Sequence, residues 1–239
     1  MFQLSDKGRG VRQMFDTIAP RYDLLNRLLS FGVDRRWRRF AVARLQVPEG
    51  GCVLDIATGT CDVALEIARM TADSVTIVGE DFTQGMLVHG QQKLDNSPYG
   101  RRILLANAPC EAIPHPDATF DAITIAFGIR NVVDRQAGLN EMFRVLKPGG
   151  RVVILEFSNP RSRVFNNLYS FYFRRLLPAV GGLLSQRSAY QYLPDSVLEF
   201  PKQEKFQAMM AAAGFTALRY HDLTFGISTV YVGDKAALD

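Results

Sequence analysis

Long hydrophobic runs, a signal-peptide core and paired cysteines are missing from this 239-residue sequence. It has no run of about 18 apolar residues, and residues 1–10 contain no apolar core, so a membrane-spanning helix and a secretory signal are both disfavoured. The three cysteines have neither C-x-x-C spacing nor an even number, which disfavours a disulfide framework and a structural zinc site. These absences predict a cytoplasmic protein in a reducing compartment.

Metal-ligand spacing and nucleic-acid motifs are missing as well. His, Cys and carboxylate residues do not cluster at the spacing of a metal site, so we expect no metal. The net charge is +4, but Lys and Arg are spread along the chain without an RNP-like sequence, zinc-finger spacing or a long basic tail. We therefore expect no nucleic-acid partner, and the mild positive charge leaves contact with an anionic membrane surface open.

Apolar strands that alternate with amphipathic helices predict one α/β domain over residues 1–239. A hydrophobic content of 47% is enough for one sizeable core. Helices separate the first five predicted strands, which indicates a doubly wound, mostly parallel sheet, and the last two strands form a hairpin. The seven predicted strands are 52–56, 75–79, 103–106, 122–127, 152–157, 217–221 and 228–232.

Three further segments complete the predicted organisation. Residues 1–47 form an N-terminal helical arm, interrupted at Pro20 and Gly32. Residues 158–196 are rich in aromatic and aliphatic side chains at helical spacing, which predicts a helical insertion that either acts as a lid over the rim or packs on the core. Residues 200–214 predict an amphipathic helix that ends at a glycine.

The stretch 52–62, C-V-L-D-I-A-T-G-T-C-D, joins a buried strand to a helix and is the strongest candidate ligand site. Ligands of open α/β sheets lie beyond the carboxyl ends of the strands, and Gly59 lets the backbone approach a bound molecule closely. A dinucleotide site would need G-x-G-x-x-G, which is not found here. Asp55 and Asp62 flank the turn; they would repel a pyrophosphate but suit the positive groups of S-adenosylmethionine.

Asp81 ends the second predicted strand, roughly 20 residues further on, where an acidic side chain can accept hydrogen bonds from both ribose hydroxyls. Because crossovers are right-handed, the loops after the first four strands lie along one edge of the sheet, here called the rim. Thr60, Asp81, residues 107–110 and Arg130 are therefore expected to converge at the rim. The alternative, that Asp55 and Asp81 are only solvated carboxylates at strand ends, stays open.

The sequence closely resembles the menaquinone/ubiquinone biosynthesis C-methyltransferases over nearly its whole length, and the demethylmenaquinone methyltransferases are the closer branch. The motifs that carry the resemblance include V-L-D-I-A-T-G-T-C-D, G-E-D-F-T-Q-G-M-L, A-F-G-I-R-N, R-Y-D-L-L-N and Y-Q-Y-L-P-D-S. The resemblance implies a Rossmann-like, seven-stranded methyltransferase that uses S-adenosylmethionine. It implies C-methylation of demethylmenaquinol, a lipophilic quinol, in the last step of menaquinone (vitamin K2) biosynthesis. Peripheral membrane contact and homodimerisation stay open.

The resemblance also assigns cofactor-binding positions. It implies that Thr60 and Asp81 bind S-adenosylmethionine, with Asp81 on the ribose. Pro109 and Cys110 stand where the family usually has Asn or Asp followed by Ala. Because proline offers no side-chain acceptor to the adenine amino group, either Asn107 supplies it or the Cys110 N–H and packing hold the ring. The full predicted set is Asp55, Gly59, Thr60, Asp81, Phe82, Asn107, Pro109 and Cys110.

Methylation of a ring carbon requires an electron-rich phenolate in line with the methyl group, and so a group that removes a hydroxyl proton. We predict that Arg130 and Asn131 stabilise the phenolate. Tyr22 or Asp34, from the arm, is predicted to handle the proton; Asp34 stands where the family commonly has His. Arg130 stays protonated and cannot be the base.

Alternatives to these assignments remain. Arg130 could instead pair with Asp134 or Glu156 for structure, and His115 and His221 are expected to be surface residues. The acceptor could be a ubiquinone-pathway benzoquinol or another lipophilic phenol. The chain could also be a non-catalytic methyltransferase-fold binding protein, for which Pro109 is the main support.

Overall fold

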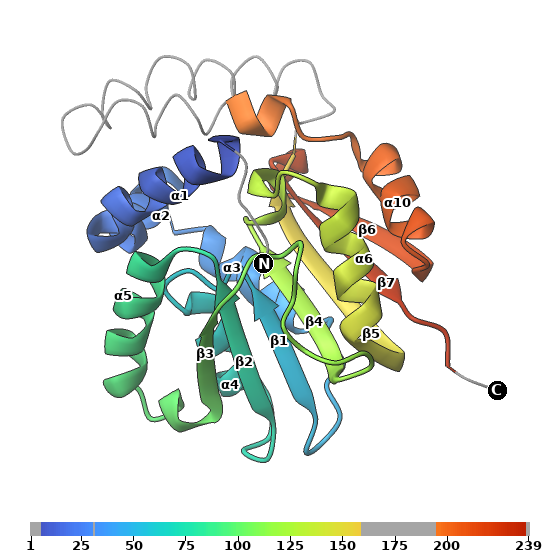
Figure 1. Ribbon diagram of the computed structural model, residues 1–239, viewed down its shortest axis with the longest axis horizontal. Coiled ribbons are helices and arrows are strands. Elements are labelled where there is room, and N and C mark those ends of the chain that lie inside the picture. The colour runs from blue at the N-terminus through green and yellow to red at the C-terminus, as the bar shows by residue number, and fades with distance from the viewer. Residues whose placement is uncertain (1–5, 31, 159–194, 238–239) are drawn as a thin grey trace.

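In the computed structural model, a central sheet carries helices on both faces, and the N-terminal helices lie across one end of the strands (Figure 1). The structure describes residues 6–30, 32–158 and 195–237. Within these residues the strands are β1 (Cys52–Ile56), β2 (Thr76–Asp81), β3 (Ile103–Asn107), β4 (Phe120–Ala126), β5 (Leu146–Phe157), β6 (Thr216–Leu223) and β7 (Ser228–Asp234). The α-helices are α1 (Asp6–Ile18), α2 (Tyr22–Ser30), α3 (Asp34–Val42), α4 (Asp62–Met70), α5 (Gln84–Asp95), α6 (Arg135–Val145) and α10 (Gln203–Ala212).

The strand order is β3-β2-β1-β4-β5-β7-β6. β1 pairs in parallel with β2 and β4, whereas β7 runs antiparallel to both β5 and β6. The predicted doubly wound, mostly parallel seven-stranded sheet with a closing hairpin is therefore confirmed. Chain order reverses direction at β1 and β4, and a switch point of this kind opens a ligand-binding crevice at the carboxyl ends of the strands.

Most strand bounds differ from the sequence prediction by one or two residues, and the largest difference is at the start of the fifth strand. Residues 147–150, expected as a turn before the fifth strand, belong to β5. The β4–β5 register shifts between Phe120 and Ala122, so the chain bulges at the proline and two glycines and still pairs on either side. Within the bulge, the Gly149 N–H donates a hydrogen bond to Lys235 O at 2.9 Å.

Two apolar layers cover the sheet because alternate side chains of a strand point to opposite faces. Val53 of β1 packs into the layer formed with α3 and α4, while Leu54 and Ile56 pack into the layer formed with α6 and α10. Both layers continue across the central strands. The core thus holds the carboxyl ends of β1 and β4 in fixed positions.

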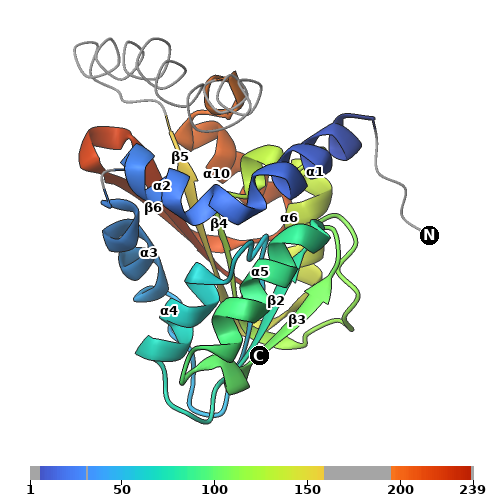
Figure 2. The same cartoon turned by 90° about the vertical axis from the view of Figure 1, so that its left-hand side faces the viewer.

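The arm consists of α1, a 3-10 turn at Ala19–Arg21, α2 and α3, and its helices end beside Pro20 and Gly32. α1 lies above α5 (Figure 2), where Ile18 and Ala19 pack on Met86. Asp16 Oδ1 accepts a hydrogen bond from Gly85 N at 2.9 Å, at the start of α5. The arm is therefore docked on α5 at the rim.

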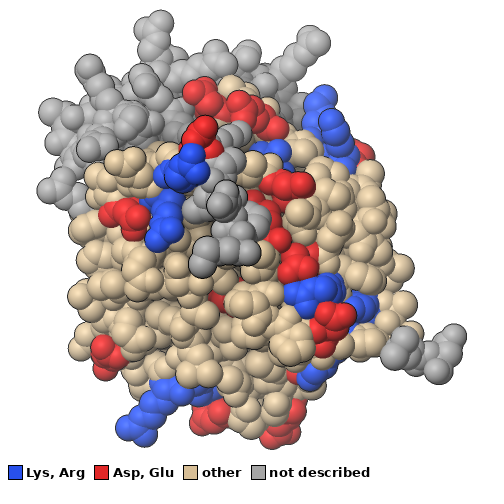
Figure 3. Space-filling model, in the orientation of Figure 1, with Lys and Arg blue, Asp and Glu red and all other residues tan. Residues whose placement is uncertain are grey.

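The predicted lid falls almost entirely on residues 159–194, outside the described residues. No described helix combines the length and apolarity that crossing a bilayer requires. On the face seen in Figure 1, acidic and basic side chains are interspersed among uncharged surface (Figure 3).

Candidate active site

The turn after β1 holds an unusual backbone conformation. Gly59 has a φ of +57°, and two non-glycine residues, Ala57 and Cys61, have φ of +51° and +67°. Left-handed conformations of this kind are costly for residues with a Cβ and persist where the surroundings enforce them. The Thr58 Oγ1 hydroxyl donates to Asp55 Oδ2 at 2.6 Å and ties the turn back to the strand.

Asp55 and Asp81 end neighbouring strands and are both buried, Asp55 with 1% of its surface exposed. Burial raises the pKa of Asp55 to about 7, and the charge of Asp81 adds to the shift. Burial also raises the pKa of Asp81 to about 6, against the opposing effect of hydrogen bonds from Thr83 N at 2.8 Å and Gly59 N at 2.9 Å. The alternative that these carboxylates are simply solvated is therefore wrong, and their burial favours a cationic ligand.

An open cleft of about 430 Å³ lies at the rim beside this turn. Three predicted site residues line it: Phe82, Cys110 and Asn131. The rest of its lining is Gly8, Ile56, Ala57, Ala108, Glu111, Gly128, Val132 and Val133, so it is largely apolar. A mostly apolar lining with a few polar groups is typical of a small-molecule site.

Asn107 and Pro109 do not line this cleft. Asn107 Nδ2 donates to Asp81 O at 2.8 Å, which engages the amide at the end of the sheet. Glu111 lines the cleft instead, and its Oε1 accepts from Val133 N at 3.1 Å. The sequence analysis missed Glu111; the available signal was its place directly after the Pro109–Cys110 pair.

Arg130 is held in a buried ion pair. Its Nη1 lies 2.7 Å from Glu156 Oε1 and donates to Phe127 O at 2.5 Å, and its backbone N donates to Glu156 Oε2 at 3.1 Å. Glu156 has no exposed surface. The alternative considered from the sequence, pairing with Glu156, is thus observed, whereas Asp134 caps α6 by accepting from Ala137 N at 2.9 Å.

Tyr22 and Asp34, the candidates for handling the proton, occupy different surroundings. Tyr22 lies beside the turn after β1, since a Cβ on Gly59 would be 4.0 Å from Tyr22 Cε1. Asp34 is buried; it accepts from Ser30 Oγ at 2.6 Å and pairs with Arg38 at 2.8 Å. Its carboxylate is therefore engaged within the arm.

A charge network that the sequence analysis missed joins the arm to the turn. Thr60 Oγ1 donates to Asp23 Oδ1 at 2.6 Å, and Lys93 Nζ lies 2.6 Å from carboxylate oxygens of both Asp23 and Asp62. Arg38 pairs with Asp62 as well. Burial alone would raise the pKa of Asp62, but the charges of Arg38 and Lys93 outweigh it and hold that pKa below its usual range.

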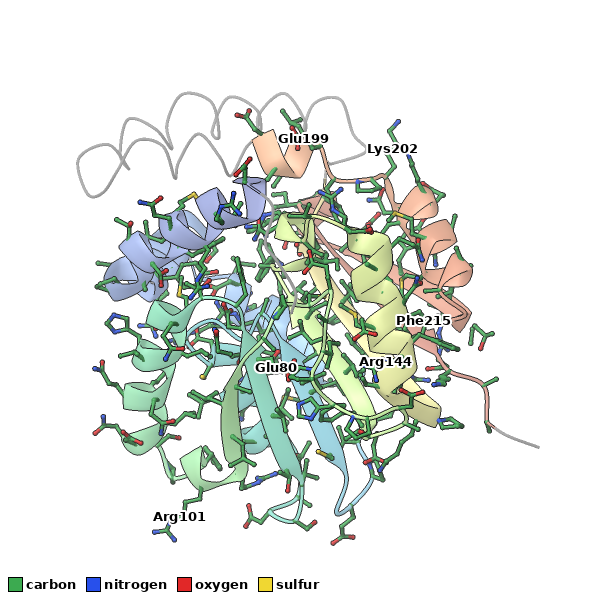
Figure 4. All side chains as sticks on the ribbon, in the orientation of Figure 1. Glu80, Arg101, Arg144, Glu199, Lys202 and Phe215 are labelled. Atoms are coloured by element: carbon green, nitrogen blue, oxygen red, sulfur yellow. The ribbon has the colours of Figure 1, made fainter. Side chains whose placement is uncertain are left out.

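His115, expected at the surface, keeps about a quarter of its side chain exposed and also reaches a buried carboxylate. Its Nε2 lies 2.8 Å from Glu80 Oε1, and Glu80 is 1% exposed near the centre of the molecule (Figure 4). Burial raises the pKa of Glu80, and His115 opposes that shift. His221 lies on the edge strand β6, where its ring packs edge-on against Phe40 at 5.6 Å.

Comparison with known proteins places these features in context. The model of the ubiE/COQ5 methyltransferase family matches residues 2–235. The chain is 66% identical over 235 residues to the ubiquinone/menaquinone biosynthesis C-methyltransferase UbiE of Geobacter sulfurreducens, covering 98% of this chain and 92% of that protein. It is 50% identical over 231 residues to the demethylmenaquinone methyltransferase of Deinococcus radiodurans, covering 96% and 94%.

Solved structures share the fold at low identity. The [4+2]-cyclase SpnF has a TM-score of 0.74 at 16% identity, covering 97% of both chains. A SAM-dependent methyltransferase from Aquifex aeolicus has a TM-score of 0.61 at 16% identity, covering 82% of this chain and 88% of that one. At these identities the likeness extends to the fold alone.

Proposed function

The chain belongs to the ubiE/COQ5 methyltransferase family, and from this premise we propose that it methylates a ring carbon of a quinol in quinone biosynthesis, with S-adenosylmethionine as the methyl donor. We propose demethylmenaquinol as the acceptor and menaquinol as the product. The observation that carries the proposal is the buried carboxylate pair, Asp55 and Asp81, beside the cleft at the rim.

The residues present fit the methyl donor. The buried carboxylates compensate positive charge in a site that water does not screen. Asp81 is proposed to accept the ribose hydroxyls, and the apolar cleft between Phe82 and Cys110 to take the adenine ring. Glu111 is proposed to accept the adenine amino group in place of the side chain that Pro109 lacks. When bound, the donor supplies a methyl group from its sulfonium.

The chain's own residues are proposed to orient the quinol and handle its proton. Asn131, which lines the cleft, is proposed to donate to the quinol oxygen as it becomes a phenolate. Tyr22 is proposed to relay the hydroxyl proton to solvent, with its own O–H donating as it accepts, because it lies at the turn and Asp34 is engaged with Arg38. A carbon–methyl bond then forms as the methyl–sulfur bond breaks, the ring carbon loses its proton to solvent, and the phenolate oxygen regains a proton to give the aromatic quinol. Arg130, bound to Glu156, acts through its neighbours rather than on the phenolate directly.

An assay of purified protein with labelled S-adenosylmethionine tests the proposal. Chemically reduced demethylmenaquinol and a demethoxybenzoquinol are supplied in parallel, with a control that lacks acceptor. We expect label in the naphthoquinol product. Label in the benzoquinol alone would assign the protein to the ubiquinone branch instead. Binding of S-adenosylmethionine without methylation of either quinol would overturn the proposal. Membrane contact and homodimerisation stay predictions.

A further inference from the structure

Three aromatic side chains from different elements meet at the rim, and we call them the aromatic wall: Trp37 of α3, Phe127 after β4 and Phe157 at the end of β5. The two phenylalanine rings are 4.6 Å apart between centroids and tilted by 34°. Trp37 lies 6.3 Å from Phe127 and 6.1 Å from Phe157, edge-on to the latter. Trp37 is buried, whereas both phenylalanines are half-buried and keep part of their surface open.

Phe127 holds its place with a strained backbone. Its φ is +58°, a left-handed conformation that a bulky residue adopts rarely. Two contacts fix it: its N–H donates to Leu155 O at 2.7 Å, and its carbonyl accepts from Arg130 Nη1. Strain of this kind persists where the surroundings over-determine it, and it concentrates at ligand sites.

The Arg130–Glu156 ion pair holds Phe127 in this strained conformation. Glu156 directly precedes Phe157, whose N–H donates to Glu156 Oε1 at 2.8 Å. Arg130 Cζ lies 5.4 Å from the Phe157 ring centroid, within the range of a cation–π contact. One buried ion pair therefore positions both phenylalanines of the wall.

The aromatic wall begins where the cofactor cleft ends. Gly128, next to Phe127, lines the cleft, and a Cβ on Gly128 would lie 2.5 Å from Ala57 Cβ in the cofactor turn. On the other side, Trp37 Nε1 donates to Thr224 Oγ1 at 2.9 Å. The wall is thus anchored at both ends and adjoins the site proposed for the methyl donor.

We propose that the aromatic wall is the surface on which the ring of the quinol stacks, with Phe127 as its specificity-determining residue. This inference rests on the proposed function and deepens it. A flat aromatic ring gains most from aromatic neighbours that lie offset or edge-on to it, and the open parts of Phe127 and Phe157 offer such neighbours. A fused bicyclic ring covers more of such a surface than a single ring, so the wall favours a naphthoquinol over a benzoquinol.

Binding can be measured without turnover because Trp37 is the one tryptophan in the sequence. An oxidised 2-prenyl-1,4-naphthoquinone is titrated into the protein, and quenching of Trp37 fluorescence is followed, with free N-acetyltryptophanamide as the inner-filter control. We expect saturable quenching by the wild type. Phe127→Leu, which keeps bulk but removes the ring, should raise the quinone dissociation constant at least fivefold, and Phe157→Leu provides a second variant of the wall.

Phe143→Leu is the matched control. Phe143 also belongs to an aromatic pair, 5.2 Å from Phe215, which lies beside α10 on the side away from the arm (Figure 4). Its quinone affinity should stay within twofold of the wild type. For all variants, the dissociation constant of S-adenosylmethionine from calorimetry should also stay within twofold.

Two results of the binding experiments would overturn the inference. One is unchanged quinone affinity in both wall variants, and the other is an equal loss of quinone and S-adenosylmethionine affinity, which would make the wall a scaffold for the cofactor turn.

The methylation assay separates the inference from the proposed function. Phe127→Leu should raise the KM for naphthoquinol and reduce the preference for naphthoquinol over benzoquinol. If the wild type methylates the naphthoquinol and Phe127→Leu has the same KM, the aromatic wall is not the quinol surface, whereas the proposed function stands. If the protein binds quinone specifically but methylates no quinol, the inference about the aromatic wall stands and the proposed function is wrong.

Discussion

Both carboxylate oxygens of Asp81 accept hydrogen bonds. Each oxygen accepts a backbone N–H, one from Gly59 on the preceding turn and one from Thr83. Burial raises its pKa to about 6, so near neutral pH the carboxyl is ionised with little margin. A protonated carboxyl would lose its negative charge and use one oxygen as a donor, leaving fewer acceptors for ribose hydroxyls.

We therefore expect the affinity for S-adenosylmethionine to fall as the pH drops below about 6, because the acidic form of Asp81 then dominates. Asp81→Asn should weaken binding more than tenfold at about pH 8. Calorimetric titrations across this pH range provide the measurement. If Asp81→Asn binds as tightly as the wild type at about pH 8, Asp81 is not a cofactor ligand.

Helix α5 joins the arm to the turn after β1. Its first turn receives Asp16 of α1, and its last turn carries Lys93, which bridges Asp23 of α2 and Asp62 of α4. Lys93 and both carboxylates are about a quarter exposed, so the bridge is only partly screened by solvent. Tyr22 directly precedes Asp23, and its position at the turn depends on this bridge.

Replacement of Lys93 by Met should loosen the arm, because Asp23 and Asp62 would then repel each other without a cation between them. We expect the S-adenosylmethionine dissociation constant to rise about fivefold, equivalent to roughly 1 kcal/mol, and trypsin to cleave the arm faster. Lys147→Met is the matched control: Lys147 pairs with Asp121 at 2.9 Å, away from the rim. Equal proteolysis rates for the two variants would contradict this role of Lys93.

At the scale of the whole molecule, the two buried carboxylates make the unliganded protein less stable at higher pH. Asp55 has a pKa of about 7 in the folded protein, against 3.8 ordinarily. The folded state therefore keeps a proton that the unfolded state releases between these values. The free energy of unfolding falls as the pH rises through this window, by about 1.4 kcal/mol for each unit of pKa shift.

Asp55→Asn should raise the melting temperature of the unliganded protein at about pH 8, since a neutral side chain avoids the cost of a buried charge. The gain should shrink toward about pH 5, where Asp55 itself is protonated in the folded state. Scanning calorimetry at both pH values checks this expectation. A variant that melts below the wild type at both would show that the carboxylate stabilises the turn by other means.

The sheet was accessible from the sequence because buried parallel strands are continuous apolar runs, and β1 was predicted with its observed bounds. The turn after β1 was located from its place after such a run, and its role in cofactor binding stays a prediction. The Arg130–Glu156 pair needed the β4–β5 register. The Lys93 bridge needed the docking of the arm, which brings Asp23 to Lys93 and Asp62. Glu80 and His115 were missed for the same reason: each sits in an ordinary local pattern, and only the fold brings them together.

The docking of the arm on α5 also determines the order in which these segments can fold during synthesis. Asp16 meets its partner, Gly85, 69 residues later in the chain. A ribosome therefore releases α1 and α2 well before the surface on which they pack exists. The arm is the first part of the described chain to be synthesised, yet it can take its final position only after β1, α4, β2 and α5 have formed.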